Sequence, residues 1–193
     1  KVLQITKEDT LLNDMLPDIY THIGHIFRDR QMYDSALVYY EKSKKIYIIQ
    51  NDILGQWACL NNIGLLLNDI CDYEQSELYN KAALKLLNDT FGNDNSYRVQ
   101  DCRARSFNNL GNLYSDQGNY KDANHYLIKS LEIKKKLGDQ IPLANTLNNL
   151  GNLSRMLGDL IKAKEYLNTS IEIKKKFLTK DHPDLAQTYS NLG

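Results

Sequence analysis

The apolar positions of this chain fall at helical spacing in one segment after another. In the third of these segments, four large side chains lie three or four positions apart, as on one face of an α-helix: Phe107, Leu110, Leu113 and Tyr114. The pattern stops at Gly118 and restarts at Tyr120 with the same spacing. Glycine between two amphipathic segments is typical of a turn. The pattern therefore predicts two helices joined by a tight turn.

This two-helix pattern recurs, each time around a glycine. Near-copies of one short sequence precede these glycines, as in Leu60-Asn-Asn-Ile-Gly64 and Leu147-Asn-Asn-Leu-Gly151. The five glycines follow one another at intervals of 40, 47, 40 and 42 residues: Gly24, Gly64, Gly111, Gly151 and Gly193. Periods of this size are typical of stacked helical hairpins. We therefore expect an all-α fold, an α-solenoid that winds as a right-handed superhelix of antiparallel helix-turn-helix repeats.

The period divides the chain into a single array. We expect the tail of a preceding repeat at 1–14, followed by four complete repeats and the first helix of a fifth: 15–54, 55–97, 98–140, 141–180 and 181–193. The polar stretch 88–96 accounts for the interval of 47 residues and predicts a protruding loop. Pro17 and Pro183 are expected near the starts of first helices, with Asp181 as a cap. We interpret the sequence as a segment of a longer protein.

Glycine inside a helix costs about 1 kcal/mol relative to alanine, so its recurrence needs a compensating reason. Close packing between the two helices of each hairpin supplies that reason. The small residues 12 positions after the glycines are predicted to face them: Ala36, Ser76, Ala123 and Ala163. The residue 16 positions after the glycine is Tyr40, Leu127 or Leu167, but Asn80 in the second repeat, where we expect less regular packing.

This combination of glycine, small residue and aromatic or aliphatic residue resembles the tetratricopeptide repeat (TPR) family. The resemblance covers nearly the whole chain. The long period, together with Lys-Asp-His-Pro-Asp-Leu-Ala at 180–186, is similar to the kinesin light chain subgroup. The resemblance to this family implies a non-enzymatic scaffold for protein–protein interaction, whose concave face binds a peptide or an extended protein segment.

Polar residues recur at the positions that such a superhelix turns toward its inner curve. An asparagine side chain offers both a donor and an acceptor, so a series of them can hold the backbone of an extended peptide. Arginines favour a ligand with acidic groups. The predicted peptide-binding residues are Asn61, Arg105, Asn108, Asn112, Asn145, Asn148, Asn152 and Arg155. The alternative is that some of these asparagines hydrogen-bond between neighbouring hairpins and only stabilise the stack.

Composition excludes several other classes of function. Lys plus Arg and Asp plus Glu both number 24, so no net charge favours nucleic acid or an anionic membrane. No Cys-x-x-Cys pair occurs among the three cysteines, which favours a reducing compartment and hence the cytoplasm. His22 and His25 lack a third metal ligand at suitable spacing, and no catalytic motif or phosphate-binding loop is present. We expect no metal, no cofactor and no enzymatic activity.

Four further expectations remain open. The chain can be the sensory or regulatory part of a larger signalling protein or enzyme, or a structural array that self-associates through exposed ends. The lysine triplets at 134–136 and 174–176 are expected to be solvated in the last turns of second helices, with a basic ridge on the outer surface for an acidic partner as the alternative. Trp57 is expected in the core, with a role as a ligand anchor as the alternative.

Overall fold

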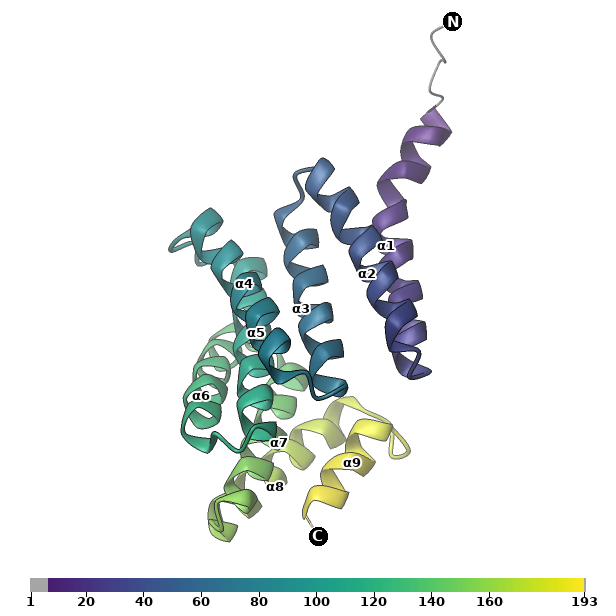
Figure 1. Ribbon diagram of the computed structural model, residues 1–193. Helices are drawn as coiled ribbons and strands as arrows, with labels where there is room; N and C mark the ends of the chain where they lie inside the picture. Colours follow the sequence, from purple (N-terminus) through teal and green to yellow (C-terminus); the bar gives the residue numbers. More distant parts are fainter. Residues whose placement is uncertain (1–6, 193) are drawn as a thin grey trace, which may run out of the picture. The chain divides into compact units, whose positions relative to one another are not determined.

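The computed structural model describes the backbone of residues 7–192 and the side chains of residues 15–192. All regular secondary structure in this part of the chain is α-helical (Figure 1). The helices are α1 (Lys7–Asp29), α2 (Tyr33–Ile49), α3 (Ile53–Asp69), α4 (Tyr73–Phe91), α5 (Tyr97–Asp116), α6 (Tyr120–Leu137), α7 (Gln140–Met156), α8 (Leu160–Phe177) and α9 (Pro183–Leu192). The predicted all-α fold of helical repeats is confirmed.

The helices form two compact units, Lys1–Gly92 and Asn93–Gly193, called unit 1 and unit 2 below. In unit 1, α1 packs on α2, α3 packs on α4, and α2 also contacts α3. In unit 2, α5 pairs with α6 and α7 with α8, while α6 contacts α7 and α8 contacts α9. The first helices of unit 2 also contact one another, α5 with α7 and α7 with α9. Each unit is therefore built from helical hairpins.

Short polar side chains begin four of the helices. Asp52 accepts a hydrogen bond from the backbone N–H of Gly55 at 2.9 Å, which satisfies a donor that the first turn of α3 leaves unpaired. Three further caps follow the same geometry: Asp72 on α4, Asn119 on α6 and Asp159 on α8. Three of the four caps begin second helices, directly after the hairpin turn, so they fix where the chain re-enters a helix.

Each described repeat glycine lies directly against the residue 16 positions later. A Cβ atom on Gly24 would lie 2.5 Å from the ring of Tyr40, and one on Gly111 would lie 2.6 Å from Leu127. Asn80 and Leu167 crowd the other two glycines in the same way, whereas Gly193 lies outside the described residues. The predicted facing residues, 12 positions after the glycines, are all buried: Ala36, Ser76, Ala123 and Ala163. The tightest contact is therefore made one helical turn later than the sequence suggested.

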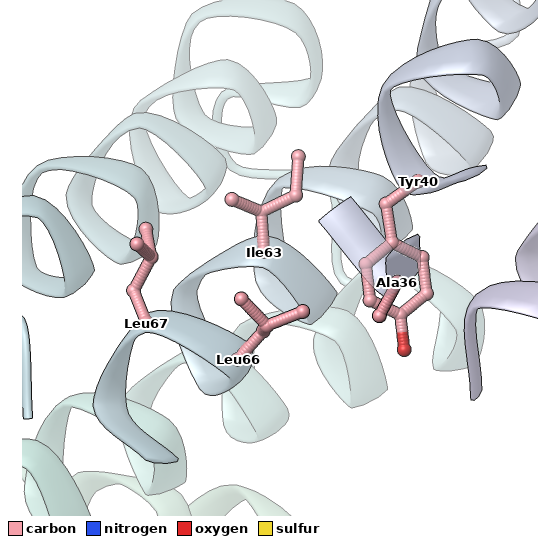
Figure 2. Close-up of a cluster of buried hydrophobic side chains, with 5 residues drawn as sticks. All are labelled: Ala36, Tyr40, Ile63, Leu66 and Leu67. Carbon is pink, nitrogen blue, oxygen red and sulfur yellow. The ribbon is translucent and has the colours of Figure 1, made fainter. Parts of the chain in front are cut away.

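A cluster of apolar side chains joins the two hairpins of unit 1 (Figure 2). Ala36 and Tyr40 come from α2, and Ile63, Leu66 and Leu67 come from α3. All five are buried. Because burying one large aliphatic side chain contributes about 1.5–3 kcal/mol, this contact is a main source of stability between the hairpins.

The beginning of the chain differs from its prediction. α1 is continuous from Lys7 to Asp29, so residues 7–14 belong to the first helix of repeat 1 and not to a preceding repeat. The remainder of that predicted tail, residues 1–6, lies outside the described residues. Pro17 consequently lies inside α1, whereas Pro183 begins α9 as predicted. At α9, the backbone N–H of Asp184 donates to His182 Nδ1, so His182 takes the capping role expected of Asp181.

The predicted loop at 88–96 is also shorter than expected. Residues 88–91 form the end of α4, and Gly92, at a φ of 47°, ends the helix. Only residues 92–96 connect α4 to α5. Additional residues of the interval between Gly64 and Gly111 extend α4 to 19 residues and α5 to 20 residues. Polar side chains in this stretch are compatible with an exposed helix end.

Candidate functional site

Asparagines on the first helices of unit 2 hydrogen-bond to one another from repeat to repeat. Asn149 Nδ2 on α7 donates to Asn108 Oδ1 on α5 at 3.1 Å. One repeat later, Asn191 Nδ2 on α9 donates to Asn148 Oδ1 on α7 at 3.0 Å. We call these two bonds the asparagine ladder. Two predicted peptide-binding residues, Asn108 and Asn148, therefore use their amide oxygens within the stack, as the stabilising alternative requires.

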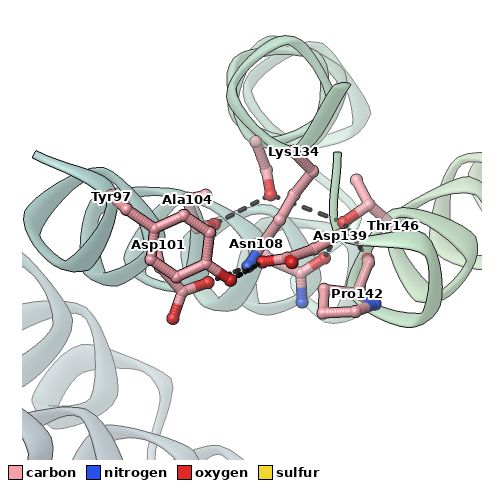
Figure 3. Close-up of polar contacts among 9 residues, drawn as sticks. Tyr97, Asp101, Ala104, Asn108, Lys134, Asp139, Pro142 and Thr146 are labelled. Atoms are coloured by element: carbon pink, nitrogen blue, oxygen red, sulfur yellow. Dashed lines mark hydrogen bonds and ion pairs between the residues drawn. The ribbon is translucent and has the colours of Figure 1, made fainter. Parts of the chain in front are cut away.

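A series of hydroxyl groups supports the ladder (Figure 3). Ser130 on α6 donates to the carbonyl oxygen of Ala104 at 2.8 Å and lies 3.4 Å from the hydroxyl of Thr146. The single hydroxyl proton of Thr146 is shared between Asn108 Oδ1 at 3.3 Å and the carbonyl oxygen of Pro142 at 3.2 Å. These contacts link α5, α6 and α7 through buried polar groups.

The serine contact recurs at the same register in three repeats. Ser43 donates to the carbonyl oxygen of Pro17 at 2.8 Å, and Ser170 donates to that of Ala144 at 2.7 Å. All three serines stand 19 positions after their glycine, where repeat 2 has Ala83. The fixed distance of these serines from the glycine makes the contact recognisable in the sequence.

The remaining predicted residues of unit 2 share a helix face with the ladder. Positions three, four and seven apart fall on one side of a helix, so α5 and α7 each present a row of polar groups. Asn112, Asn145 and Asn152 are half-buried, whereas Arg105 and Arg155 are exposed. We call this surface the asparagine face, formed by Arg105, Asn108 and Asn112 on α5 and by Asn145, Asn148, Asn152 and Arg155 on α7. The structure thus brings seven of the eight predicted binding residues onto two adjacent helices.

One atom of the asparagine face has no partner. Asn152 Oδ1 is buried and accepts no hydrogen bond from any described residue. Asn112 occupies the same position of the preceding repeat, directly after Gly111. A polar side chain thus follows the glycine in both repeats of unit 2 that the structure describes in full.

Unit 1 differs at the equivalent positions. His25, which follows Gly24, lies with its Nδ1 2.9 Å from the hydroxyl of Tyr40, and burial raises the pKa of Tyr40 to about 12. Arg28 Nε donates to Asp69 Oδ2 at 2.6 Å, linking α1 to α3. Asn61 is only 4% exposed, so its side chain is enclosed by protein and is not grouped with the other predicted binding residues. Trp57 is likewise buried and fits the core interpretation.

Other candidate chemistry receives no support. Among the residues that the structure describes, no group of three His, Cys, Asp or Glu side chains could hold a metal ion. The three cysteines are free; Cys59 and Cys102 are buried, and burial raises the pKa of the Cys102 thiol to about 11, which makes it a poor nucleophile. None of the described helices is both long and apolar enough to cross a membrane.

The lysine triplets are only partly solvated. Lys134 and Lys174, the first residue of each triplet, are 2% and 3% exposed, which corrects the expectation that all six are in water. Lys134 forms an ion pair with Asp101 (Figure 3). Lys174 donates instead to the hydroxyl of Thr188 at 2.9 Å and to the carbonyl oxygen of Asp184.

Profiles described as tetratricopeptide repeat match residues 17–47, 103–140 and 142–193 of this chain. The chain belongs to the tetratricopeptide repeat family. The TPR fold is generally non-enzymatic and serves as a scaffold for protein–protein interaction. Comparison with curated protein sequences gives no match.

Several solved structures share the TPR architecture. BtubC (BKLC) from P. vanneervenii is 25% identical, with a TM-score of 0.67 over 89% of this chain and 67% of its own. A Rap protein complexed with competence and sporulation factor is 18% identical, with a TM-score of 0.71 over 98% of this chain and 53% of its own. A Podosopora anserina protein described as a kinesin light chain with nearly identical TPR-like repeats is 15% identical, with a TM-score of 0.56 over 93% of this chain and 84% of its own. This chain thus spans between about half and five-sixths of the lengths of these proteins.

Proposed function

We propose that the asparagine face of unit 2 binds a peptide or an extended protein segment. The observation that carries this proposal is the row of half-buried amides on adjacent helices, with Asn112 on α5 and Asn145 and Asn152 on α7. Asn152 Oδ1 has no donor among the described residues and is itself enclosed by protein. An unsatisfied buried acceptor costs about 1–3 kcal/mol, so a rotation of this side chain that lets Oδ1 accept a backbone N–H of a bound segment would relieve that cost.

The arrangement of the neighbouring amides suits an extended ligand. Asn112 and Asn152 occupy equivalent positions on α5 and α7, two helices that contact each other. Each carboxamide can accept a backbone N–H and donate to a backbone carbonyl, whatever side chains the ligand carries. Arg105 and Arg155 lie exposed on the same face and favour ligands with carboxylates nearby, because charge-assisted hydrogen bonds are the stronger ones.

The fold is compatible with such a role. The Rap protein whose structure is similar to this chain was solved in a complex with competence and sporulation factor. That complex supports the view that a scaffold of helical repeats with this fold can hold a ligand.

The test is a selection of peptides from a random display library on the immobilised protein, followed by calorimetric titration of the best binder. The double variant Asn112→Ala with Asn152→Ala removes two pairs of hydrogen bonds and is expected to weaken binding about tenfold or more. Asn124→Ala, on the exposed side of α6, is the matched control and should leave the affinity unchanged. Equal affinity of the double variant and the native chain would remove the asparagine face as the binding site.

A further inference from the structure

The hydrogen bonds of the asparagine ladder continue along α9. Gln187 Nε2 donates to Asn191 Oδ1 at 3.2 Å, and Asn191 Nδ2 donates to Asn148 Oδ1 on α7. Residues four positions apart lie on the same side of a helix, so Gln187 shares a face with the ladder residue Asn191. On α7, Asn145 stands in the same way four positions before the ladder residue Asn149. α9 therefore presents a polar side chain on the side where α7 presents Asn145.

Gln187 completes a row across the first helices of unit 2. Arg105 on α5, Asn145 on α7 and Gln187 on α9 each stand six positions before the glycine of their repeat, and we call them the polar row. One ladder bond joins α5 to α7 and another joins α7 to α9, so side chains at equal distances from the glycine lie side by side on these helices. Unit 1 differs, because Asp18 and Ala58 occupy the same position there.

The amides of the polar row keep hydrogen-bonding groups available. Gln187 is exposed, and its Oε1 accepts no hydrogen bond from any described residue. The half-buried amide of Asn145 makes no hydrogen bond within the described part of the chain. A carboxamide oxygen can accept a backbone N–H, and its nitrogen can donate to a backbone carbonyl. Gln187 thus offers on α9 the chemistry that Asn112 and Asn152 offer on α5 and α7.

We infer that the ligand of the asparagine face is an extended segment of at least about six residues that crosses α5, α7 and α9, and that Gln187 binds it on α9. This role of Gln187 rests on the function proposed above. Packed helices lie about 8–10 Å apart, so about 16–20 Å separate α5 from α9. An extended chain rises about 3.3 Å per residue and covers this distance with about five or six residues. A helical segment of the same length, at about 1.5 Å per residue, reaches only from one helix to the next.

The test uses the best peptide from the selection described above, titrated by calorimetry against the native chain and Gln187→Ala. We expect Gln187→Ala to weaken binding about three- to tenfold, because it removes one or two hydrogen bonds to the peptide. If Gln187 only stabilised α9 through Asn191, the effect of the substitution would not depend on peptide length. The peptide is therefore shortened from each end in turn. Shortening from one end to about four residues should abolish the effect of Gln187→Ala and preserve that of Asn112→Ala.

Gln75→Ala is the matched control, because Gln75 is exposed on α4 of unit 1 and lies outside the polar row; it should leave the affinity unchanged. Three results would overturn the role of Gln187: unchanged affinity of Gln187→Ala, an effect that persists however the peptide is shortened, or an α-helical circular dichroism signal of the bound peptide.

The Asn112→Ala with Asn152→Ala variant separates this role from the proposed function. Weakened binding of that variant, together with unchanged binding of Gln187→Ala, would keep the proposed function and reject α9 as part of the site. Unchanged binding of the double variant, or a selection that yields no binding peptide, would overturn both.

Discussion

Asn149 and Asn108 are joined across two neighbouring repeats by a hydrogen bond of 3.1 Å between amide groups, and Asn191 and Asn148 repeat the contact one period later. The donors Asn149 and Asn191 stand two positions before the glycines of their own repeats. The acceptors Asn108 and Asn148 stand three positions before the glycines of the preceding repeats. At both of these contacts in unit 2, a directional bond fixes how one first helix is placed against the next. The paired asparagines are thus primarily register elements of the stack.

Asn149→Ala removes the donor of one ladder bond and should lower the free energy of unfolding by about 1 kcal/mol. Thr146 continues to donate to Asn108, so the loss should not exceed that of one hydrogen bond. Thermal and urea denaturation followed by circular dichroism measure the effect, with exposed Asn124→Ala as the control. An unchanged midpoint for Asn149→Ala would show that the ladder does not stabilise the array.

Much of the fold was readable from the sequence because the hairpin is a local unit. Helical spacing of apolar residues and glycine-containing turns are short-range signals. From α3 onward the first helices begin within two residues of the expected repeat starts, whereas α1 begins at Lys7. The glycine contact was predicted less accurately, because Tyr40 and Leu127 reach the glycine from one turn further along the second helix. Side-chain length, which a spacing argument neglects, decides that detail.

The site was predictable only as a set of candidates. Two asparagines in a row look alike in sequence, and only the placement of α5 against α7 shows that Asn108 is bonded internally whereas Asn152 Oδ1 has no described partner. The burial of Lys134 and Lys174 was missed for a related reason. A lysine triplet at a helix end is usually solvated, and the partners of the two buried lysines lie on other helices, Asp101 on α5 and Asp184 with Thr188 on α9.

Asn80 lies where the other repeats place Tyr40, Leu127 and Leu167 against the glycine. It is 1% exposed, and although its Nδ2 donates to the carbonyl oxygen of Ser76, its Oδ1 is buried without an acceptor contact to any described donor. Asn80→Leu should therefore raise the free energy of unfolding by about 1–2 kcal/mol, because it removes the unpaired polar atom and adds apolar burial.

The reciprocal change is the matched control. Leu127→Asn places an amide beside Gly111 in a completely buried site and should lower stability by about 2–4 kcal/mol. Urea denaturation of both variants gives the comparison. A loss of stability on Asn80→Leu would mean that the amide of Asn80 is a structural requirement of repeat 2.

The hairpin turns of the two units use different residues at one strained position. Gln31 and Cys71 adopt positive φ angles of 59° and 61°, whereas Gly118 and Gly158 occupy the equivalent places at 76° and 79°. A residue other than glycine loses about 1–2 kcal/mol of stability when its backbone adopts the left-handed region. Replacing it with glycine recovers only part of that loss, because glycine also makes the unfolded chain more flexible. Gln31→Gly should therefore stabilise the chain by about 0.5 kcal/mol.

Gly118→Gln provides the opposite exchange. A Cβ at Gly118 meets no atom within 4 Å, so any loss reports backbone conformation and not crowding. We expect a loss of about 0.5–1 kcal/mol by urea denaturation. If both exchanges change stability in the same direction, backbone strain is not the controlling factor at this position.

Lys174 and Lys134 occupy equivalent buried sites with different partners, so the same substitution should have opposite effects. Lys134 has the carboxylate of Asp101, but the corresponding position of the next repeat is Ile141, and Lys174 donates only to neutral oxygens. Lys134→Met leaves Asp101 without its partner and should cost about 1–2 kcal/mol, whereas Lys174→Met should stabilise by about 1 kcal/mol.

The gain from Lys174→Met should depend on pH. Burial lowers the pKa of Lys174, an effect that outweighs the attraction of Asp184. The folded chain therefore releases this proton at a lower pH than the unfolded chain, in which lysine titrates near about 10.4. The destabilisation by Lys174 is complete below its folded-state pKa and is relieved as the pH rises toward the unfolded value. The difference in the free energy of unfolding between Lys174→Met and the native chain should thus be largest at neutral pH. It should shrink as the pH rises toward about 10, near the pKa of lysine in the unfolded chain. An advantage that stays constant or grows with pH would show that the ammonium group of Lys174 is not disfavoured by its burial.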